Sequence, residues 1–381
     1  MVRDRLGVPP VSPVWDGRFG AELRRLRMSA GLSLRQLAPL VLSSRGHLHD
    51  LETGRRQPTI DLATRLDTAL GADGLLSGMR RPVASSADPE RLAYVARHPR
   101  RIDPATLHAL ADSLTAHRRL EDTLGSTSLL PTIRAQLDMM ITLVTETAGV
   151  LRPQVVDVAA QWAQFGGWLY AASDQRRLAG RWYGTALEWG TEAGNPDMVA
   201  TVLSLRGHLA WSERRADAVV DLSAAAARQP ASPGVRAIAT QQQARGHALT
   251  GETSAAIALL DRAAELHEAA GRAPDREPPW IYFHSPAYLT MQRGLAYRLL
   301  GRDADAIDHL RRGLAGLPAE SASAAWTGPY LLRLAAALAD TGDADEAFDI
   351  YERVRILGRV TRTATLIDQA EAAVRTLSAR R

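Results

Sequence analysis

The chain has 381 residues, of which 46% are hydrophobic and 23% charged, with 46 basic residues, 42 acidic residues and no Cys. This composition is typical of a globular protein with two or three domains. The lack of Cys excludes disulfides and thiolate metal sites. No run of about eighteen apolar residues is present, and the first residues do not resemble a secretory leader. We therefore expect a cytoplasmic protein with no membrane partner.

The basic residues are unevenly distributed. Residues 1–81 contain 13 Arg and 8 acidic residues, whereas residues 82–381 contain 33 Arg and 34 acidic residues. All 46 basic residues are Arg, for which a GC-rich coding bias is a sufficient explanation. A basic excess confined to one end of the sequence is what the neutralisation of nucleic-acid phosphates requires.

Apolar spacing and capping residues predict five short helices between Phe19 and Leu76. The second runs from Ser33 to Val41 and the third from Ser44 to Glu52, and a short turn of about three residues separates them. Ser33 and Ser44 are of the type that caps helix N-termini, because a hydroxyl can accept hydrogen bonds from the free N–H groups there. Two short helices separated by a tight turn are the layout of a helix-turn-helix DNA-binding domain.

The segments SLRQLA, from Ser33 to Ala38, and SSRGHLHDLETGRRQP, from Ser43 to Pro58, resemble the phage repressor and Cro family. Its bacterial members are called the xenobiotic-response-element type. The resemblance covers about sixty residues. It implies that the third helix lies in the DNA major groove and that the second crosses the backbone.

The resemblance also implies residue roles. Ser44 falls where the family contacts phosphate, while Arg45, Gly46 and Asp50 fall where it reads bases. Arg45 is the strongest candidate, since Arg can bind guanine O6 and N7 together. Arg27 and Glu52 fall where the family forms an ion pair between the first and third helices. The predicted DNA-binding residues are Ser33, Arg35, Ser44, Arg45, Gly46, His47, His49, Asp50, Arg55 and Arg56.

Two residues depart from the family pattern. Pro39 lies inside the second helix, where it cannot donate to the carbonyl of Arg35, so a kink or an early 3₁₀ ending is expected. Leu42 stands in the turn, where the family often has Gly, so the angle between the helices is expected to differ somewhat. The alternative interpretation is a helical bundle with no DNA role.

Composition and pattern divide the rest of the chain. We expect an arm at 1–17, the DNA-binding domain at 18–76, a Ser-, Ala- and Pro-rich linker at 77–90, connecting helices at 91–150 and a repeat domain at 151–381. Within the connecting region, one helix is predicted to begin at Pro104 and another after Pro131.

The repeat domain shows five similar turns, each followed by a helix. The Ala residues that close them, Ala179, Ala218, Ala256, Ala306 and Ala347, are spaced by 39, 38, 50 and 41 residues. Gly167, Gly207, Gly246 and Gly294 lie in the preceding helices. The pattern resembles tetratricopeptide repeats, whose unit is 34 residues. A final helix, Thr363 to Leu377, would close the stack. The predicted fold class is therefore all-α, with an α-solenoid of helix pairs after the five-helix domain; an all-helical bundle is the alternative.

The sequence offers no catalytic constellation. Zinc-binding spacings are absent, and a phosphate-binding loop of the Walker type needs a Lys. We therefore expect no enzyme activity, no metal site and no cofactor.

The repeats do predict a concave ligand-binding groove. In the repeat family, residues three before, one after and four after the small residue at each helix crossing tend to face the groove. The segment from Glu277 to Pro286 is an aromatic, Pro-rich insert that could cover it. Packing between repeats is the alternative role for these aromatic residues. The ligand-binding candidates are Trp168, His208, Trp211, Gln243, His247, Trp280, Tyr282 and Arg298.

Together these features predict a sequence-specific bacterial transcriptional regulator, located with the nucleoid. Its expected partners are a pseudo-palindromic double-stranded DNA operator, a second copy of the chain in a homodimer, and a peptide or small-molecule effector. The alternatives are a protein-interaction adaptor that no longer contacts DNA and an antitoxin-like repressor whose repeats bind a partner protein.

Overall fold

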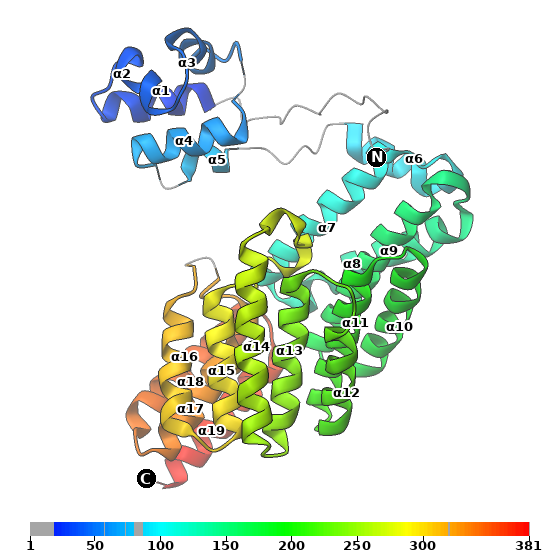
Figure 1. The fold of residues 1–381 in the computed structure, drawn as a ribbon, viewed down its shortest axis with the longest axis vertical. Helices are drawn as coiled ribbons and strands as arrows, with labels where there is room; N and C mark the ends of the chain where they lie inside the picture. Colours follow the sequence, from blue (N-terminus) through cyan, green and yellow to red (C-terminus); the bar gives the residue numbers. More distant parts are fainter. Residues whose placement is uncertain (1–18, 57, 73, 80–86, 319–320, 381) are drawn as a thin grey trace. The chain divides into compact units, whose positions relative to one another are not determined.

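The computed structural model describes residues 19–56, 58–72, 74–79, 87–318 and 321–380. Within these ranges every regular element is a helix, which confirms the predicted all-α fold class (Figure 1). The chain forms two compact units, Met1–Ala93 and Tyr94–Arg381. The predicted arm and residues 80–86 of the predicted linker lie outside the described residues. None of the described helices combines the length and the apolar character needed to span a membrane.

The first unit is a small bundle around a leucine core. Leu23, Leu37, Leu48, Leu66 and Leu76 are fully buried and come one from each helix. The five helices predicted from the sequence are confirmed: α1 (Phe19–Ser29), α2 (Leu34–Leu40), α3 (Arg45–Glu52), α4 (Ile60–Leu70) and α5 (Leu75–Gly78).

Helix α1 is fixed against the end of α3 by a close approach and an ion pair. A Cβ on Gly20 would lie 2.5 Å from the Leu51 carbonyl oxygen, so only glycine fits there. Arg27 Nε and Nη2 donate to the two carboxylate oxygens of Glu52 at 2.6 and 3.0 Å, and Arg27 Nη1 donates to the Leu32 carbonyl at 2.7 Å. The predicted ion pair is confirmed, and its bidentate geometry fixes the orientation of α3.

The turn between α2 and α3 accommodates both departures from the family pattern. Pro39 lies in the last turn of α2, and the helix ends one residue later, at Leu40. Leu42 has a φ of 50°, in the left-handed region that favours glycine. The turn therefore has a conformation that glycine would adopt without strain, and Leu adopts it with its side chain 79% exposed.

The second unit is a stack of antiparallel helix pairs. Helix α6 (Ala87–Arg97) contains the division between the units, and neighbouring helices of the stack pack side by side (Figure 1). The remaining helices are α7 (Pro104–Leu124), α8 (Ser126–Glu146), α9 (Arg152–Ala172), α10 (Arg176–Glu192), α11 (Pro196–Ser212), α12 (Ala216–Ala227), α13 (Pro233–Leu249), α14 (Thr253–Gly271), α15 (Pro286–Leu299), α16 (Asp303–Ala315), α17 (Gly328–Asp340), α18 (Ala344–Val360) and α19 (Ala364–Arg380).

Short 3₁₀ segments connect some of these helices: η1 (Pro99–Arg101), η2 (Gly149–Leu151), η3 (Pro274–Arg276), η4 (Pro279–Ile281) and η5 (Ala325–Thr327). One helix start differs from the prediction. Helix α8 begins at Ser126 rather than after Pro131, and Pro131 lies inside it. Leu129, before the proline, and Ile133, after it, are both buried, so packing maintains one continuous helix across the missing N–H.

A left-handed residue marks each of the five turns within the pairs. These residues are Asp174, Arg214, Gly251, Gly301 and Gly342, with φ between 58° and 97°. Each lies two positions before the second helix of its pair. In the second pair this register places Val219, which is fully buried, where the other pairs have Ala. The prediction of Ala218 at that position was wrong by one residue.

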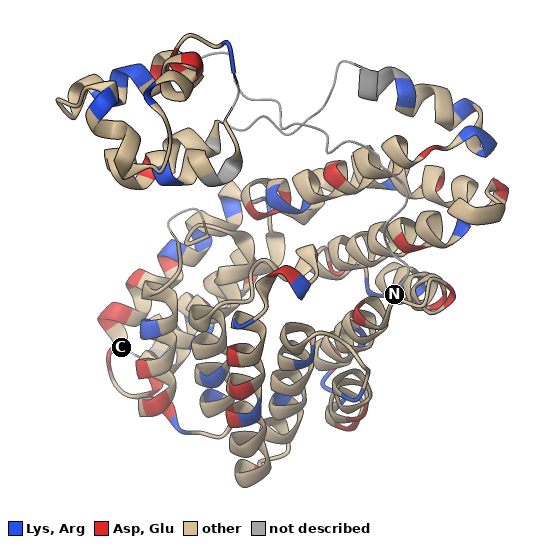
Figure 2. Cartoon of the chain, turned by 45° about the horizontal axis from the view of Figure 1, so that its top comes forward, with Lys and Arg blue, Asp and Glu red and all other residues tan. Residues whose placement is uncertain are grey.

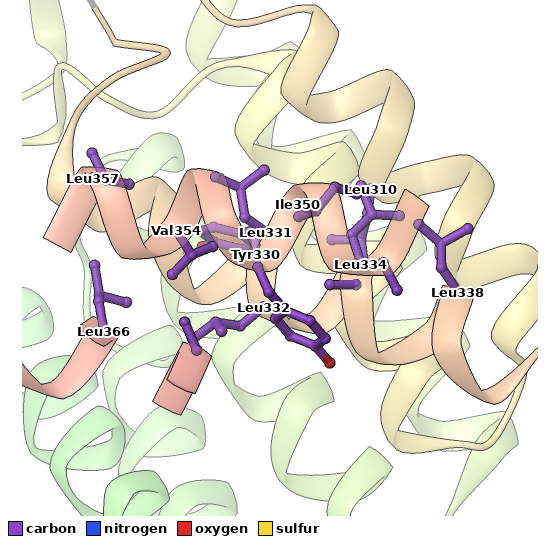
Figure 3. Packing of buried hydrophobic residues seen from close by; sticks show 14 of the residues in the cluster. Leu310, Tyr330, Leu331, Leu332, Leu334, Leu338, Ile350, Val354, Leu357 and Leu366 are labelled. Carbon is purple, nitrogen blue, oxygen red and sulfur yellow. The ribbon is translucent and has the colours of Figure 1, made fainter. Parts of the chain in front are cut away.

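The end of the stack has an extensive apolar core. Figure 3 shows Leu331, Ile350 and Val354 packed together where α17 and α18 meet, with the hydroxyl of Tyr330 pointing away from them. Leu366 and Ala370 of α19 are buried in the same cluster, which confirms the predicted final helix. Its observed bounds, Ala364–Arg380, extend beyond the predicted end at Leu377.

Replacing Leu42 with Asn is expected to stabilise the first unit by about 1 kcal/mol, because Asn tolerates the left-handed conformation and an exposed Leu contributes little packing. Hydrogen exchange of the α2 and α3 amides should slow about fivefold. The control is Leu40→Asn, at the exposed last residue of α2, which has no left-handed conformation to relieve, so exchange should not slow. Faster exchange in Leu42→Asn would contradict the assigned strain.

Candidate functional sites

The N-termini of α2 and α3 are capped as the sequence predicts. The Ser33 hydroxyl accepts from the Gln36 N–H at 3.3 Å, while the Gln36 side chain accepts from the Ser33 N–H at 2.9 Å, which makes a capping box. The Ser44 hydroxyl accepts from the His47 N–H at 3.1 Å. These caps define where α3 begins, and so which of its side chains face outward.

The outer face of α3 carries most of the residues predicted to contact DNA. Arg45, Gly46 and His49 are exposed, and His47 and Asp50 are partly exposed. No atom lies within 4 Å of the position that a Cβ on Gly46 would occupy. Ser33 and Arg35, on α2, are also exposed. Leu48 and Leu51 are buried on the opposite face of α3, so its reading and packing faces are separate.

Arg55 and Arg56 follow α3 in a Schellman turn. Gly54 has a φ of 71°, the Arg55 N–H donates to the Asp50 carbonyl at 2.8 Å, and the Gly54 N–H donates to the Leu51 carbonyl at 3.1 Å. Both Arg side chains are about two-thirds exposed and lie 3.8–3.9 Å from the Asp50 carboxylate. These are loose surface ion pairs, so the two guanidinium groups are available to phosphates.

The second candidate site is a cavity of about 300 Å³ in the second unit. Its walls come from α7 and from the first helix of each pair, α9, α11, α13, α15 and α17. Most of the lining is aromatic or apolar, and four of the eight Trp residues of the chain contribute to it. Concave surfaces of this kind, with a few convergent polar groups, bind small ligands.

The aromatic insert between α14 and α15 forms one side of the cavity. Trp280 Nε1 donates to the Thr201 hydroxyl on α11 at 2.9 Å, and the Tyr282 hydroxyl donates to the Asp122 carboxylate on α7 at 2.9 Å. Arg119 lies over the Tyr282 ring, with its guanidinium carbon 4.0 Å from the ring centroid. The insert therefore joins α7 to α11 across the concave face.

Equivalent positions in three successive pairs form a row along the cavity. Trp168, His208 and Arg245 each lie six positions before the left-handed residue of their own pair. The Trp168 and His208 rings are 6.1 Å apart, and Arg245 Nη2 lies 3.5 Å from His208 Nδ1. The guanidinium of Arg245 also covers the ring of Trp211, at 4.2 Å. This row places a cation between aromatic walls.

Burial changes the acid–base behaviour of the cavity residues. Removal from water, together with the charge of Arg245, lowers the pKa of His208 to about 3, so this imidazole is neutral at physiological pH. Burial lowers the pKa of Arg118 to about 10, which still leaves it charged. Burial raises the pKa of Glu121, which accepts a hydrogen bond from Ser126. Neighbouring Asp122 also has a raised pKa, again because of burial.

Five of the predicted ligand-binding residues line this cavity: Trp168, His208, Trp211, Trp280 and Tyr282. The other three lie elsewhere. Gln243 is partly exposed on α13 outside the lining, His247 Nδ1 lies 2.9 Å from the Glu252 carboxylate, and Arg298 pairs with Asp303 and Asp340.

The groove rule selected the wrong residues on α13 because it was counted from Gly246. A Cβ on Gly246 would approach Val220 of α12, the preceding pair, at 2.6 Å, whereas one on Gly167 would approach Tyr183 of its own partner helix. Gly246 is therefore not the crossing residue of its pair. Ala244, seven positions before Gly251, occupies the crossing and packs with Ala256 and Leu260 of α14. Counted from Ala244, the same rule selects Arg245.

Sequence reasoning missed several polar residues of the lining. Arg245 could have been found by counting back from the turn residue Gly251 instead of counting from Gly246. Arg118 gave no such signal, because α7 lies before the repeats and its role depends on packing against α9 and η4. The missed polar lining residues include Arg118, Glu121, Asp122, Thr201, Gln242, Arg245, Tyr288, Gln292, Tyr330 and Arg333.

Comparison with known proteins identifies the first unit. Residues 18–77 match the family described as a helix-turn-helix domain. The first unit thus contains a helix-turn-helix DNA-binding domain. A comparison with curated proteins gave no match.

Two solved structures resemble the chain remotely. One is PlcR of Bacillus thuringiensis in complex with the peptide PapR7 and DNA, at 12% identity and a TM-score of 0.32, covering 78% of this chain and 93% of that one. The other is the apo form of the competence regulator ComR of Streptococcus vestibularis, also at 12% identity and a TM-score of 0.32, covering 84% of this chain and 98% of that one.

The neutral state of His208 predicts a pH dependence. Because its folded pKa lies below its unfolded value of about 6.5, stability is retained above pH 6.5 and falls as the pH drops toward 3. Between pH 7 and pH 5 the loss should be up to about 2 kcal/mol. His208→Gln, which keeps an acceptor for Arg245, should remove this part of the slope in denaturant unfolding. An unchanged slope would show that His208 is not held neutral.

Proposed function

We propose that this protein is a sequence-specific bacterial transcriptional regulator whose repeat unit binds an effector in its concave cavity. The observation that carries the proposal is the outward face of α3, with Arg45 and Gly46 exposed on a domain that matches the helix-turn-helix family. A cavity of about 300 Å³ in the same chain supplies a place for an effector. We place the protein in the cytoplasm, on the nucleoid.

In this proposal Arg45, Gly46 and Asp50 face base edges, with His47 and His49 beside them. Ser33, Arg35 and Ser44, together with Arg55 and Arg56, lie at phosphates and set the position of α3. A single helix-turn-helix covers half of a typical site, so we propose a homodimer whose two recognition helices lie about 34 Å apart on a pseudo-palindrome. An effector changes DNA affinity only if it binds one conformation of the dimer better than the other.

Sequencing the genomic DNA that copurifies with the protein tests this proposal. The expected result is an enriched site with two half-sites about one helical turn apart. In gel retardation at moderate salt, the enriched fragment should resist random competitor DNA. A protein-interaction adaptor would show no competitor-resistant band, and that outcome would contradict DNA regulation.

Arg45→Ala is expected to relax base preference at one position of the half-site, at a cost of about 1–3 kcal/mol on the preferred sequence. Arg55→Ala should instead weaken binding to all sequences and lower the salt slope by about 1. Binding measured by fluorescence anisotropy over a salt series distinguishes the two. If Arg45→Ala leaves operator selection unchanged, the assigned reading face is wrong.

Gly46→Ala separates DNA contact from folding. The added methyl group meets open space in the free protein, and Ala favours the helix by up to about 1 kcal/mol, so stability should rise. DNA affinity should nevertheless fall about tenfold, because the methyl group enters the space between α3 and DNA. Gly20→Ala is the matched control. It should destabilise the first unit, since its Cβ would overlap the Leu51 carbonyl. Unchanged affinity in Gly46→Ala would place the N-terminus of α3 away from DNA.

A further inference from the structure

Arg245 is a buried cation without an anionic partner. The residue is 4% exposed, and within the described residues no carboxylate is among the groups that act on its charge. Its contacts are the Trp211 ring and His208 Nδ1, and its Nε has no hydrogen-bond partner. A buried guanidinium remains charged at neutral pH, so the protein holds a positive charge inside the cavity wall.

Such a charge is unfavourable unless something compensates for it. The ring of Trp211 compensates in part through a cation–π contact. Burial and the positive charge of Arg333 both lower the pKa of Arg245. The nearby Tyr288 and Tyr330 are uncharged at neutral pH because burial raises their pKa. The wall around Arg245 therefore lacks the negative charge that the guanidinium requires.

Arg118, on α7, is the second buried cation of the cavity. It is 4% exposed, and its Nε and Nη1 have no hydrogen-bond partner, while Nη2 lies 3.4 Å from Gln164 Oε1. Its guanidinium faces the rings of Trp280 and Phe165 at 5.8 and 6.0 Å. The same helix contributes Glu121 and Asp122 to the cavity, so its wall is less cationic than that of α13.

The remaining lining favours a flat apolar group. Trp168 contacts the His208 ring at one end of the row, and Trp211 lies under the guanidinium of Arg245 at the other end. Two amides on neighbouring helices leave polar atoms unused, Nε2 of Gln242 and Oε1 of Gln292. A volume of about 300 Å³ lies at the lower end of the range for pockets that bind small molecules. This size favours a small molecule over a peptide.

We propose that the cavity binds a small aromatic carboxylate, whose carboxylate group pairs with Arg245 and whose ring packs against the aromatic lining, which includes Trp168 and Trp211. A guanidinium matches a carboxylate with two parallel hydrogen bonds. At the other end of the ligand, Arg118 donates hydrogen bonds to an uncharged oxygen of the ligand. Only the role of this ligand as the effector rests on the proposed function; its binding in the cavity does not.

The test uses the full-length protein without DNA, so that a failure of DNA binding leaves its result unaffected. The probes are benzoate, 2-naphthoate and indole-3-acetate, each with its primary amide as a neutral match. Binding is followed by the fluorescence of the cavity Trp residues and by the melting temperature. At least one carboxylate should bind, and its amide should bind about 30-fold more weakly or worse, as loss of a buried charge pair implies.

Variants then test the role of Arg245. Arg245→Met should abolish the preference for carboxylates, whereas Arg245→Lys should retain it in part. Ligand-free Arg245→Met should melt at or above the wild-type temperature, because an unpaired buried charge has been removed. Arg293→Met, which removes an Arg paired with Asp261 outside the lining, is the control and should bind carboxylates normally.

Four outcomes would overturn the proposal. They are no binding by any of the carboxylates, equal binding of acids and amides, a preference that survives Arg245→Met, and a preference abolished by Arg118→Met instead. A pentapeptide with a free C-terminus that binds more tightly than every aromatic acid would also overturn the assigned ligand class.

Discussion

The second unit depends on one repeated constraint, the close approach of two helices at a small residue seven positions before a left-handed turn. Gly167 and Gly294 show the constraint most directly, since a Cβ at either position would lie within 3 Å of the partner helix. The turn residue fixes how far the chain reverses, and the small residue fixes how closely the helices pack. Together they determine the rotation of each helix about its axis, and therefore which side chains face the concave surface.

This constraint explains how a cavity arises from side chains that are far apart in the sequence. One residue after each crossing, the chain places Trp168, then His208, then Arg245, on the first helices of three successive pairs. Stacking of the pairs brings these side chains together. The Trp168 and His208 ring centroids are 6.1 Å apart, and Arg245 Nη2 lies 3.5 Å from His208 Nδ1. A row of equivalent positions can thus hold an aromatic ring, a neutral imidazole and a cation together, although no local sequence motif contains all three.

The two units distribute charge in different ways. Figure 2 shows acidic and basic residues mixed along the helices of the second unit, in agreement with its 32 Arg and 32 acidic residues. Its two notable cations, Arg118 and Arg245, are buried in the cavity wall. In the first unit, Arg45, Arg55 and Arg56 are exposed, where Coulomb attraction to a polyanion can act. The same residue type thus suits an open surface in one unit and an enclosed site in the other.

The sequence by itself determined the helix-turn-helix and the helical repeats, because caps, turn residues and apolar spacing are local signals. The capping of α2 and α3 and the Arg27–Glu52 pair follow from residue types at fixed spacing. Only the tertiary structure decided that Ala244 rather than Gly246 is the crossing residue of α13, that Val219 replaces Ala218, and that Arg118 joins the cavity. A shift of one residue rotates a helical side chain by about 100°, and packing between helices, which no local pattern records, sets that rotation.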